Sequence, residues 1–244
     1  MGLLYSIIYL LTVNHAIAAN DQEHEKSANH SVLKQMKDTT QIDKINQIAL
    51  PDLSLKYELQ DSKQKVEWLM DRKANSIATF NSASQQGEVW SLNKYGDIEH
   101  NRVFVLDKTI VDYTNGQLKT LDKLPQWNQL VSVYDPKQIS KLSKAGEKVL
   151  FGKAVSIYEG LLNGLPTIIW WISDMKIPAY VQLGEGNSRT SMTLKEVYTQ
   201  TPSNWKWVDP SNLLNYARID ASDFGDMEND PFVKKLLELE GHYH

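Results

Sequence analysis

The densest group of residues able to do chemistry is the acidic run from Asp220 to Asp230. Carboxylate oxygens at such spacing are ligands that Ca²⁺ accepts. The run does not match the EF-hand loop, because its glycine and its closing glutamate stand at other positions. Helix capping explains the run better, since Asp226 to Asp230 would place negative charge ahead of a predicted helix. We therefore expect no metal site.

Histidine is the side chain best suited to general-base chemistry near neutral pH. The mature chain should keep five of the six histidines, and four of these lie near its ends, which leaves His100. No Gly-x-Ser-x-Gly element and no His-x-x-x-His pair accompanies it. Paired carboxylates that are distant in sequence, as in a glycosidase, remain an alternative. We expect no catalytic residues and no enzyme. An envelope hydrolase using His100 or Asp223 is the third hypothesis.

Large rings and a thioether recur in segments where polar and apolar side chains alternate. On one face of a sheet they form either a concave apolar pocket or a solid core. Trp170 and Trp171 are adjacent, so they must point to opposite faces of one strand. For the pocket, the expected lining residues are Tyr57, Trp68, Met70, Trp90, Phe104 and Trp170.

The hydrophobic pattern that positions these side chains has a period of two after Pro51. Leu53 to Leu59 and Val66 to Met70 alternate with polar residues, which predicts an antiparallel hairpin with one wet face. The following turns are too short for crossover helices, so the sheet should be an antiparallel meander. Further predicted strands are 77–80, 88–92, 102–106, 109–113, 154–158, 167–172, 179–183 and 191–199.

Three segments show helical spacing of apolar residues. The first covers residues 31–49 and stops before Pro51. A second is predicted over 135–145, with Asp135 as N-cap, Pro136 at the first helical position and Gly146 as terminator. The third follows Asp230 and Pro231 near the end of the chain.

The first nineteen residues have the pattern of a signal peptide. Leu3 to Val13 is an apolar run too short to span a bilayer, and small residues then predict cleavage near Ala18/Ala19. No later apolar run reaches spanning length, so we expect no transmembrane anchoring in the mature form.

Composition excludes several classes of protein. The chain has no cysteine. It can therefore form no disulfide and carry no lipid on a cysteine, and the stability of its fold must come from burial of apolar side chains. A net charge of −4 and a pI of about 5.9 argue against nucleic acid as a partner. We expect no cofactor and a soluble monomer.

Several loose motifs resemble the LolA/LolB-like fold, which includes lipoprotein carriers of the Gram-negative periplasm and RseB-like stress sensors. The residues that carry this resemblance, within roughly 50–210, are Gly87–Trp90, Asp112–Gly116, Tyr158–Gly160 and Trp170–Ser173, which leads to Ile177-Pro178. The resemblance implies a strongly curved, incomplete barrel whose concave face holds acyl chains under a lid of helices. The sequence identifies no counterpart of the arginine inside the carrier's cavity.

Together these patterns predict an α+β protein with a strongly curved antiparallel sheet, covered by N-terminal, middle and C-terminal helices. The expected divisions are a signal peptide (1–19), a flexible leader and helix (20–50), a sheet domain (51–215) with an inserted helix near 135–145, and a helical tail (216–244) packing on it. The expected function is periplasmic binding of a hydrophobic ligand or an acylated lipoprotein. The alternative is an interaction protein with a solid core and no ligand.

Overall fold

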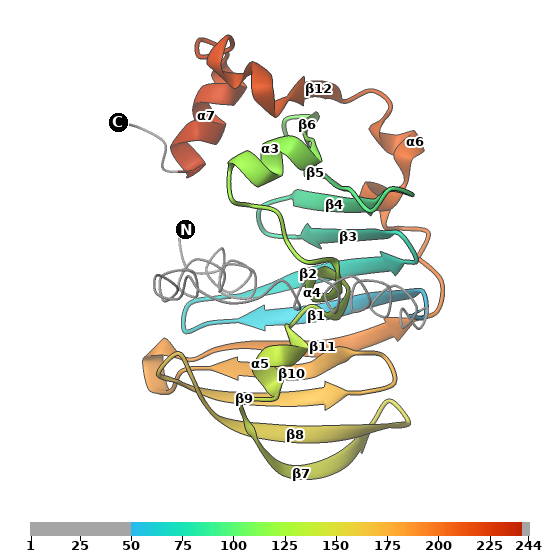
Figure 1. The fold of residues 1–244 in the computed structure, drawn as a ribbon, viewed down its shortest axis with the longest axis vertical. Coiled ribbons are helices and arrows are strands. Elements are labelled where there is room, and N and C mark those ends of the chain that lie inside the picture. Colours follow the sequence, from blue (N-terminus) through green and yellow to red (C-terminus); the bar gives the residue numbers. More distant parts are fainter. Residues whose placement is uncertain (1–49, 241–244) are drawn as a thin grey trace, which may run out of the picture.

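A single sheet of twelve strands dominates the computed structural model, which describes residues 50–240. The strand order is β12-β6-β5-β4-β3-β2-β1-β11-β10-β9-β8-β7, so the sheet stays open, with β12 and β7 at its ends (Figure 1). The strands are β1 (Leu53–Gln60), β2 (Lys65–Lys73), β3 (Ser76–Asn81), β4 (Gln86–Leu92), β5 (Ile98–Phe104), β6 (Thr109–Tyr113), β7 (Ser143–Leu150), β8 (Lys153–Leu162), β9 (Leu165–Ile172), β10 (Ile177–Leu183), β11 (Thr190–Tyr198) and β12 (Ala217–Asp220).

The chain builds this sheet in two meanders that meet at its centre. Strands β1 to β6 run outward to one end, and a helical crossover then carries the chain to β7 at the other end. Strands β7 to β11 return until β11 pairs with β1. The crossover contains α3 (Asn115–Thr120), α4 (Trp127–Ser132) and α5 (Pro136–Ile139).

The last segment of the chain adds the strand at the β6 end of the sheet. Residues 199–216, which we call the C-terminal strap, contain α6 (Pro210–Leu213) and lead to β12. Strand β12 lies parallel to β6, whereas the other strand pairs among the described residues are antiparallel. Helix α7 (Pro231–Glu240) follows a short 3₁₀ turn (Ala221–Gly225).

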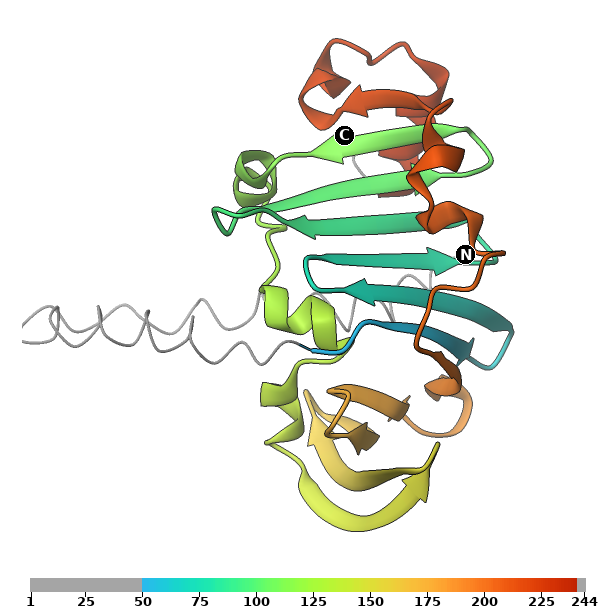
Figure 2. The ribbon, with the colours of Figure 1, turned by 90° about the vertical axis from the view of Figure 1, so that its right-hand side faces the viewer.

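The two faces of the sheet have different covers. We call the face that carries Tyr57 and Trp68, which pair directly across β1 and β2, the inner face. Helices α4 and α5 lie on one side of the sheet and the α6 segment lies on the other (Figure 2). On the outer face, Trp205 and Trp207 of the strap pack with Phe80 of β3. The crossover and the strap therefore bury opposite faces.

The predicted α+β class and the curved, incomplete antiparallel sheet are confirmed. Strands β7 and β8 bend strongly (Figure 2). Helix α7 also begins as predicted, because Asp230 Oδ1 accepts hydrogen bonds from the main-chain nitrogens of Phe232 and Val233. Asp220 likewise caps the 3₁₀ turn by accepting from the nitrogen of Ser222. The acidic run thus serves as helix caps at two places.

The prediction of an inserted helix near 135–145 is wrong about the length of the helix. Asp135 caps α5 and Pro136 is its first residue, but the helix ends at Ile139. Residues from Ser143 form the edge strand β7, whose side chains are mostly exposed, so it lacks the apolar alternation that marks a strand. The strand predicted at 102–106 also begins earlier, at Ile98.

The predicted signal peptide, leader and first helix lie outside the described residues. Within residues 50–240 no helix is long and apolar enough to cross a membrane.

Candidate functional site

Four of the six predicted pocket residues lie together on the inner face. Tyr57 and Trp68 have ring centroids 5.7 Å apart, and Met70 lies in the same core cluster. Trp90 is half-buried on β4 and packs against both this cluster and a second one at the β6 end of the sheet. The structure thus forms an apolar inner surface at the middle of the sheet.

The other two predicted residues lie outside this group. Phe104 belongs to the second cluster and meets Phe232 of α7 edge-on, with 5.0 Å between centroids. Trp170 is half-buried on the outer face, where it pairs with Tyr180 and Lys148 Nζ lies over its ring. Phe104 thus lies at the β6 end of the inner face, and Trp170 packs against the main cluster from the outer face.

The inner surface is closed in this structure. Tyr57 is 0% exposed, and Met70 is 1% exposed. A side chain lining a cavity that holds a water molecule keeps some surface accessible to that water, and Tyr57 keeps none. Space for a ligand beside Tyr57 therefore requires that the covering segment move.

We call that covering segment, residues 127–142 with α4 and α5, the lid segment. Tyr134, Ile139 and Leu142 are its buried anchors in the main cluster. Leu142 approaches β8 so closely that a Cβ on Gly160 would lie 3.1 Å from its Cδ2. The α4 part packs less deeply, since Trp127, Leu130, Val131 and Val133 are only partly buried.

Arg72 joins the lid segment to the sheet. Its Nη1 donates to the main-chain oxygen of Val131 at 2.8 Å and to that of Met175 at 2.9 Å. Its Nε and Nη2 donate to the oxygen of Pro51 at 3.3 and 3.2 Å. Arg72 is 1% exposed. One guanidinium therefore holds together the end of α4, the β9–β10 turn and the start of β1.

Arg72 was not among the expected site residues, although the sequence contains a signal for it. Val66, Trp68 and Met70 occupy alternate positions of β2, and Arg72 continues this inward series. A charged residue at an inward position of an apolar strand is uncommon unless its hydrogen bonds are satisfied.

Burial dominates the electrostatics around this arginine. It lowers the pKa of the Arg72 guanidinium, while Tyr57 and Asp52 act in the opposite direction. Burial also raises the pKa of the Tyr57 phenol, whose hydroxyl donates to the main-chain oxygen of Pro178 at 2.9 Å. The site presents polar groups that are already bonded to main-chain carbonyls.

His100 lies on the inner face of β5 between two rings. Its ring stacks on Trp90 with centroids 3.6 Å apart, and Tyr113 lies 5.5 Å away on β6. Its Nε2 has no hydrogen-bond partner among the described residues, with Glu88 Oε2 3.8 Å away. Burial, followed by the charges of Arg102 and Lys123, lowers the pKa of His100 well below its ordinary value. A buried, stacked imidazole packs as an aromatic residue.

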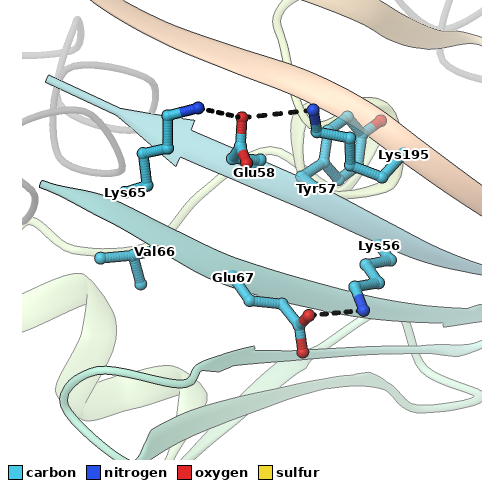
Figure 3. A pocket seen from close by; sticks show the side chains of 7 residues that line it. All are labelled: Lys56, Tyr57, Glu58, Lys65, Val66, Glu67 and Lys195. Carbon is cyan, nitrogen blue, oxygen red and sulfur yellow. Dashed lines mark hydrogen bonds and ion pairs between the residues drawn. The ribbon is translucent and has the colours of Figure 1, made fainter.

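The outer face carries a shallow hollow of about 170 Å³ between β1, β2 and β11 (Figure 3). Lys65 and Lys195 both bond to Glu58, and Lys56 pairs with Glu67 at 2.6 Å. The pKa of Glu58 is lowered, chiefly by its hydrogen bond with Lys195. Because each carboxylate already has a cationic partner, the hollow offers little net charge to a ligand. Exposed pairs of this kind also contribute little to stability.

No protein-family model and no curated protein matches the sequence. Several solved structures are similar. The chain is 13% identical to PNGF-II over 72% of its own length and 33% of that chain, with a TM-score of 0.39. It is 11% identical to MucB over 71% of its own length and 62% of the MucB chain, with a TM-score of 0.41. It is 7% identical to a putative outer membrane lipoprotein-sorting protein domain from Vibrio parahaemolyticus. That similarity covers 72% of this chain and 97% of the other, with a TM-score of 0.30.

The similar structures include MucB and a lipoprotein-sorting protein domain, which is consistent with the distant resemblance of the sequence motifs to a LolA/RseB-like fold. The chain spans about a third of the PNGF-II chain and less than two thirds of the MucB chain.

Proposed function

We propose that this protein binds the acyl part of a lipid or an acylated protein between the inner face of its sheet and the lid segment. The single observation that carries this proposal is the position of Arg72. Its guanidinium is buried under the lid segment and donates hydrogen bonds to main-chain oxygens of three separate segments.

The physical reason is the cost of burying a charge. A protein that needed only a solid core would lose little by having a well-packed apolar residue at this position. Hydrogen bonds to carbonyls, in contrast, hold the lid segment closed and break without leaving a carboxylate behind. Arg72 therefore suits a cover that opens and closes.

Burial of apolar surface would supply the affinity. Opening the lid segment would expose Trp68, Met70 and Trp90, which the acyl chain would cover in its place. Each methylene removed from water contributes about 0.8 kcal/mol. A ligand with a long acyl chain can thus offset the loss of the Arg72 hydrogen bonds, each with a net worth of roughly 1.5–3 kcal/mol.

A second candidate function is an interaction protein with a permanently closed core. The complete burial of Tyr57 and the near-complete burial of Met70 favour it. In both cases we propose a periplasmic protein without catalytic activity. The aromatic stacking of His100, the histidine considered as a general base, supports this proposal.

Native mass spectrometry of the protein purified from its own compartment separates the two functions. We expect lipid-sized adducts, together with binding of a dansyl-labelled long-chain fatty acid. Trp90→Asp should abolish both signals, because it places a charge on the inner surface.

Trp170→Asp is the matched control. Trp170 is also a half-buried tryptophan on a strand but lies on the outer face, so its substitution should leave both signals intact. A clean apo mass, with no fatty-acid binding and no gain in melting temperature on adding phosphatidylethanolamine vesicles, would support the closed-core protein instead.

A further inference from the structure

The lid segment contains an unusual backbone conformation at Val133, the residue that ends α4. Its φ is 63° and its ψ is −32°. Six other non-glycine residues described here also have positive φ, and Val133 is the only β-branched one among them. A branched Cβ clashes with the main chain in this region, so the conformation is strained.

This strain lies at the junction between the two parts of the lid segment. Helix α4 has six residues, and its N-cap Gln126 makes no side-chain capping bond. At the other end, the oxygen of Val131 accepts its hydrogen bond from Arg72. The next residues, Tyr134 and Ile139, are buried anchors. Val133 therefore separates α4, which is held at its end by Arg72 and whose apolar residues are only partly buried, from the part of the lid segment with buried apolar anchors.

We propose that Val133 is a strained hinge that sets how often α4 lifts from the inner face. The strain exists only while α4 is docked, because rotation of Val133 to a negative φ relieves it. It therefore raises the energy of the closed state and leaves the open state unchanged. Arg72 acts against it by holding the oxygen of Val131. The role of this hinge in ligand entry rests on the function proposed above.

The arrangement also explains why a valine would be kept at this position. Glycine or asparagine adopts positive φ with far less strain, and either would leave α4 docked more permanently. A branched residue maintains a larger open population. The inner surface then becomes accessible without any loss of the anchors.

Hydrogen exchange of the ligand-free protein tests the hinge. Exchange of the amides of residues 127–132 reports the opening of α4 when closing is fast. Val133→Gly and Val133→Asn should each slow this exchange about fivefold or more relative to the wild type. The asparagine variant keeps a Cβ, so it separates relief of strain from the added chain entropy of glycine.

Lys108→Gly is the matched control. Lys108 also has positive φ, at 48°, but lies in the β5–β6 turn. Its substitution should leave exchange at residues 127–132 unchanged. Unchanged or faster exchange in both Val133 variants would overturn the proposal, and so would a failure of both to fold. The measurement needs no ligand. A protein that binds no lipid but shows slower exchange in these variants would keep the hinge and lose the proposed function.

Discussion

Arg72 Nη1 lies 2.8 Å from the main-chain oxygen of Val131, and this hydrogen bond ties the sheet to the last turn of α4. The two residues are 59 positions apart in the sequence. The bond also satisfies a carbonyl at the end of a helix that no intrahelical donor reaches. A sheet residue thus completes the helix that covers it.

Removing this arginine should loosen the lid segment and destabilise the fold. Arg72→Ala leaves the oxygens of Pro51, Val131 and Met175 without their donor, and we expect a loss of about 2–5 kcal/mol in unfolding free energy. Urea unfolding measures the loss, and hydrogen exchange at residues 127–132 should become faster. Arg72→Lys should fall between the wild type and the alanine variant, because an ammonium cannot span three acceptors in the same geometry. An alanine variant as stable as the wild type would contradict this account of Arg72.

His100 should make stability depend on pH on the acidic side. Its pKa is lowered in the folded state, so the unfolded chain takes up the proton first as the pH falls. The stability present above about pH 6.5 is therefore lost as the pH falls from there toward the folded pKa. Between pH 7.5 and 5.0 the wild type should lose more unfolding free energy than His100→Phe, which keeps a ring between Trp90 and Tyr113. Parallel losses in the two proteins would show that His100 does not cause the dependence.

Tyr57 should make stability depend on pH on the alkaline side. Burial raises its folded pKa, so the unfolded chain loses the phenolic proton first, and stability present below pH 10 is lost as the pH rises. At pH 7, Tyr57→Phe should be about 1–2 kcal/mol less stable, because the oxygen of Pro178 loses its donor. At pH 11 this difference should shrink by roughly 1.4 kcal/mol, since phenylalanine does not titrate. Denaturant unfolding at both pH values is the measurement, and a constant difference would be the contrary result.

The C-terminal strap should depend on a small polar cluster on the outer face. Asp71 Oδ1 accepts hydrogen bonds from Ser54 Oγ at 2.5 Å and from Thr201 Oγ1 at 2.7 Å. Thr201→Val should cost about 1–2 kcal/mol and increase protease cleavage within residues 199–216. Thr193→Val, on the same face but outside this cluster, is the control. Equal protease resistance of the two variants would show that Asp71 does not secure the strap.

Sequence patterns predicted the elements whose residues alternate strongly. Leu53 to Leu59 show a clean period of two, and both predicted strands of this hairpin formed. The predicted wet face was wrong in part, because Ser54, Leu69 and Asp71 on the outer face are buried. Helix α7 was equally clear, because Asp230 and Pro231 give a local start signal that no distant contact overrides.

The rest depends on contacts between distant residues. Strand β7 has exposed residues along most of its length and gains its structure by pairing with β8. Trp170 has the same residue type as Trp90, and only the pairing of β9 with β10 places it on the outer face. Arg72 finds its acceptors in segments that no local pattern connects to it.

The most direct test of the account is to locate a bound acyl chain. Crystals grown with a fatty acid brominated along its chain would show the bromine by anomalous scattering. We predict bromine peaks between α4 and the inner face, in contact with Trp68, Met70 or Trp90. The contrary result would be crystals saturated with the fatty acid whose bromine peaks lie only on the outer face, with α4 still docked and Arg72 still bonded to Val131. That result would contradict the proposed acyl-binding site.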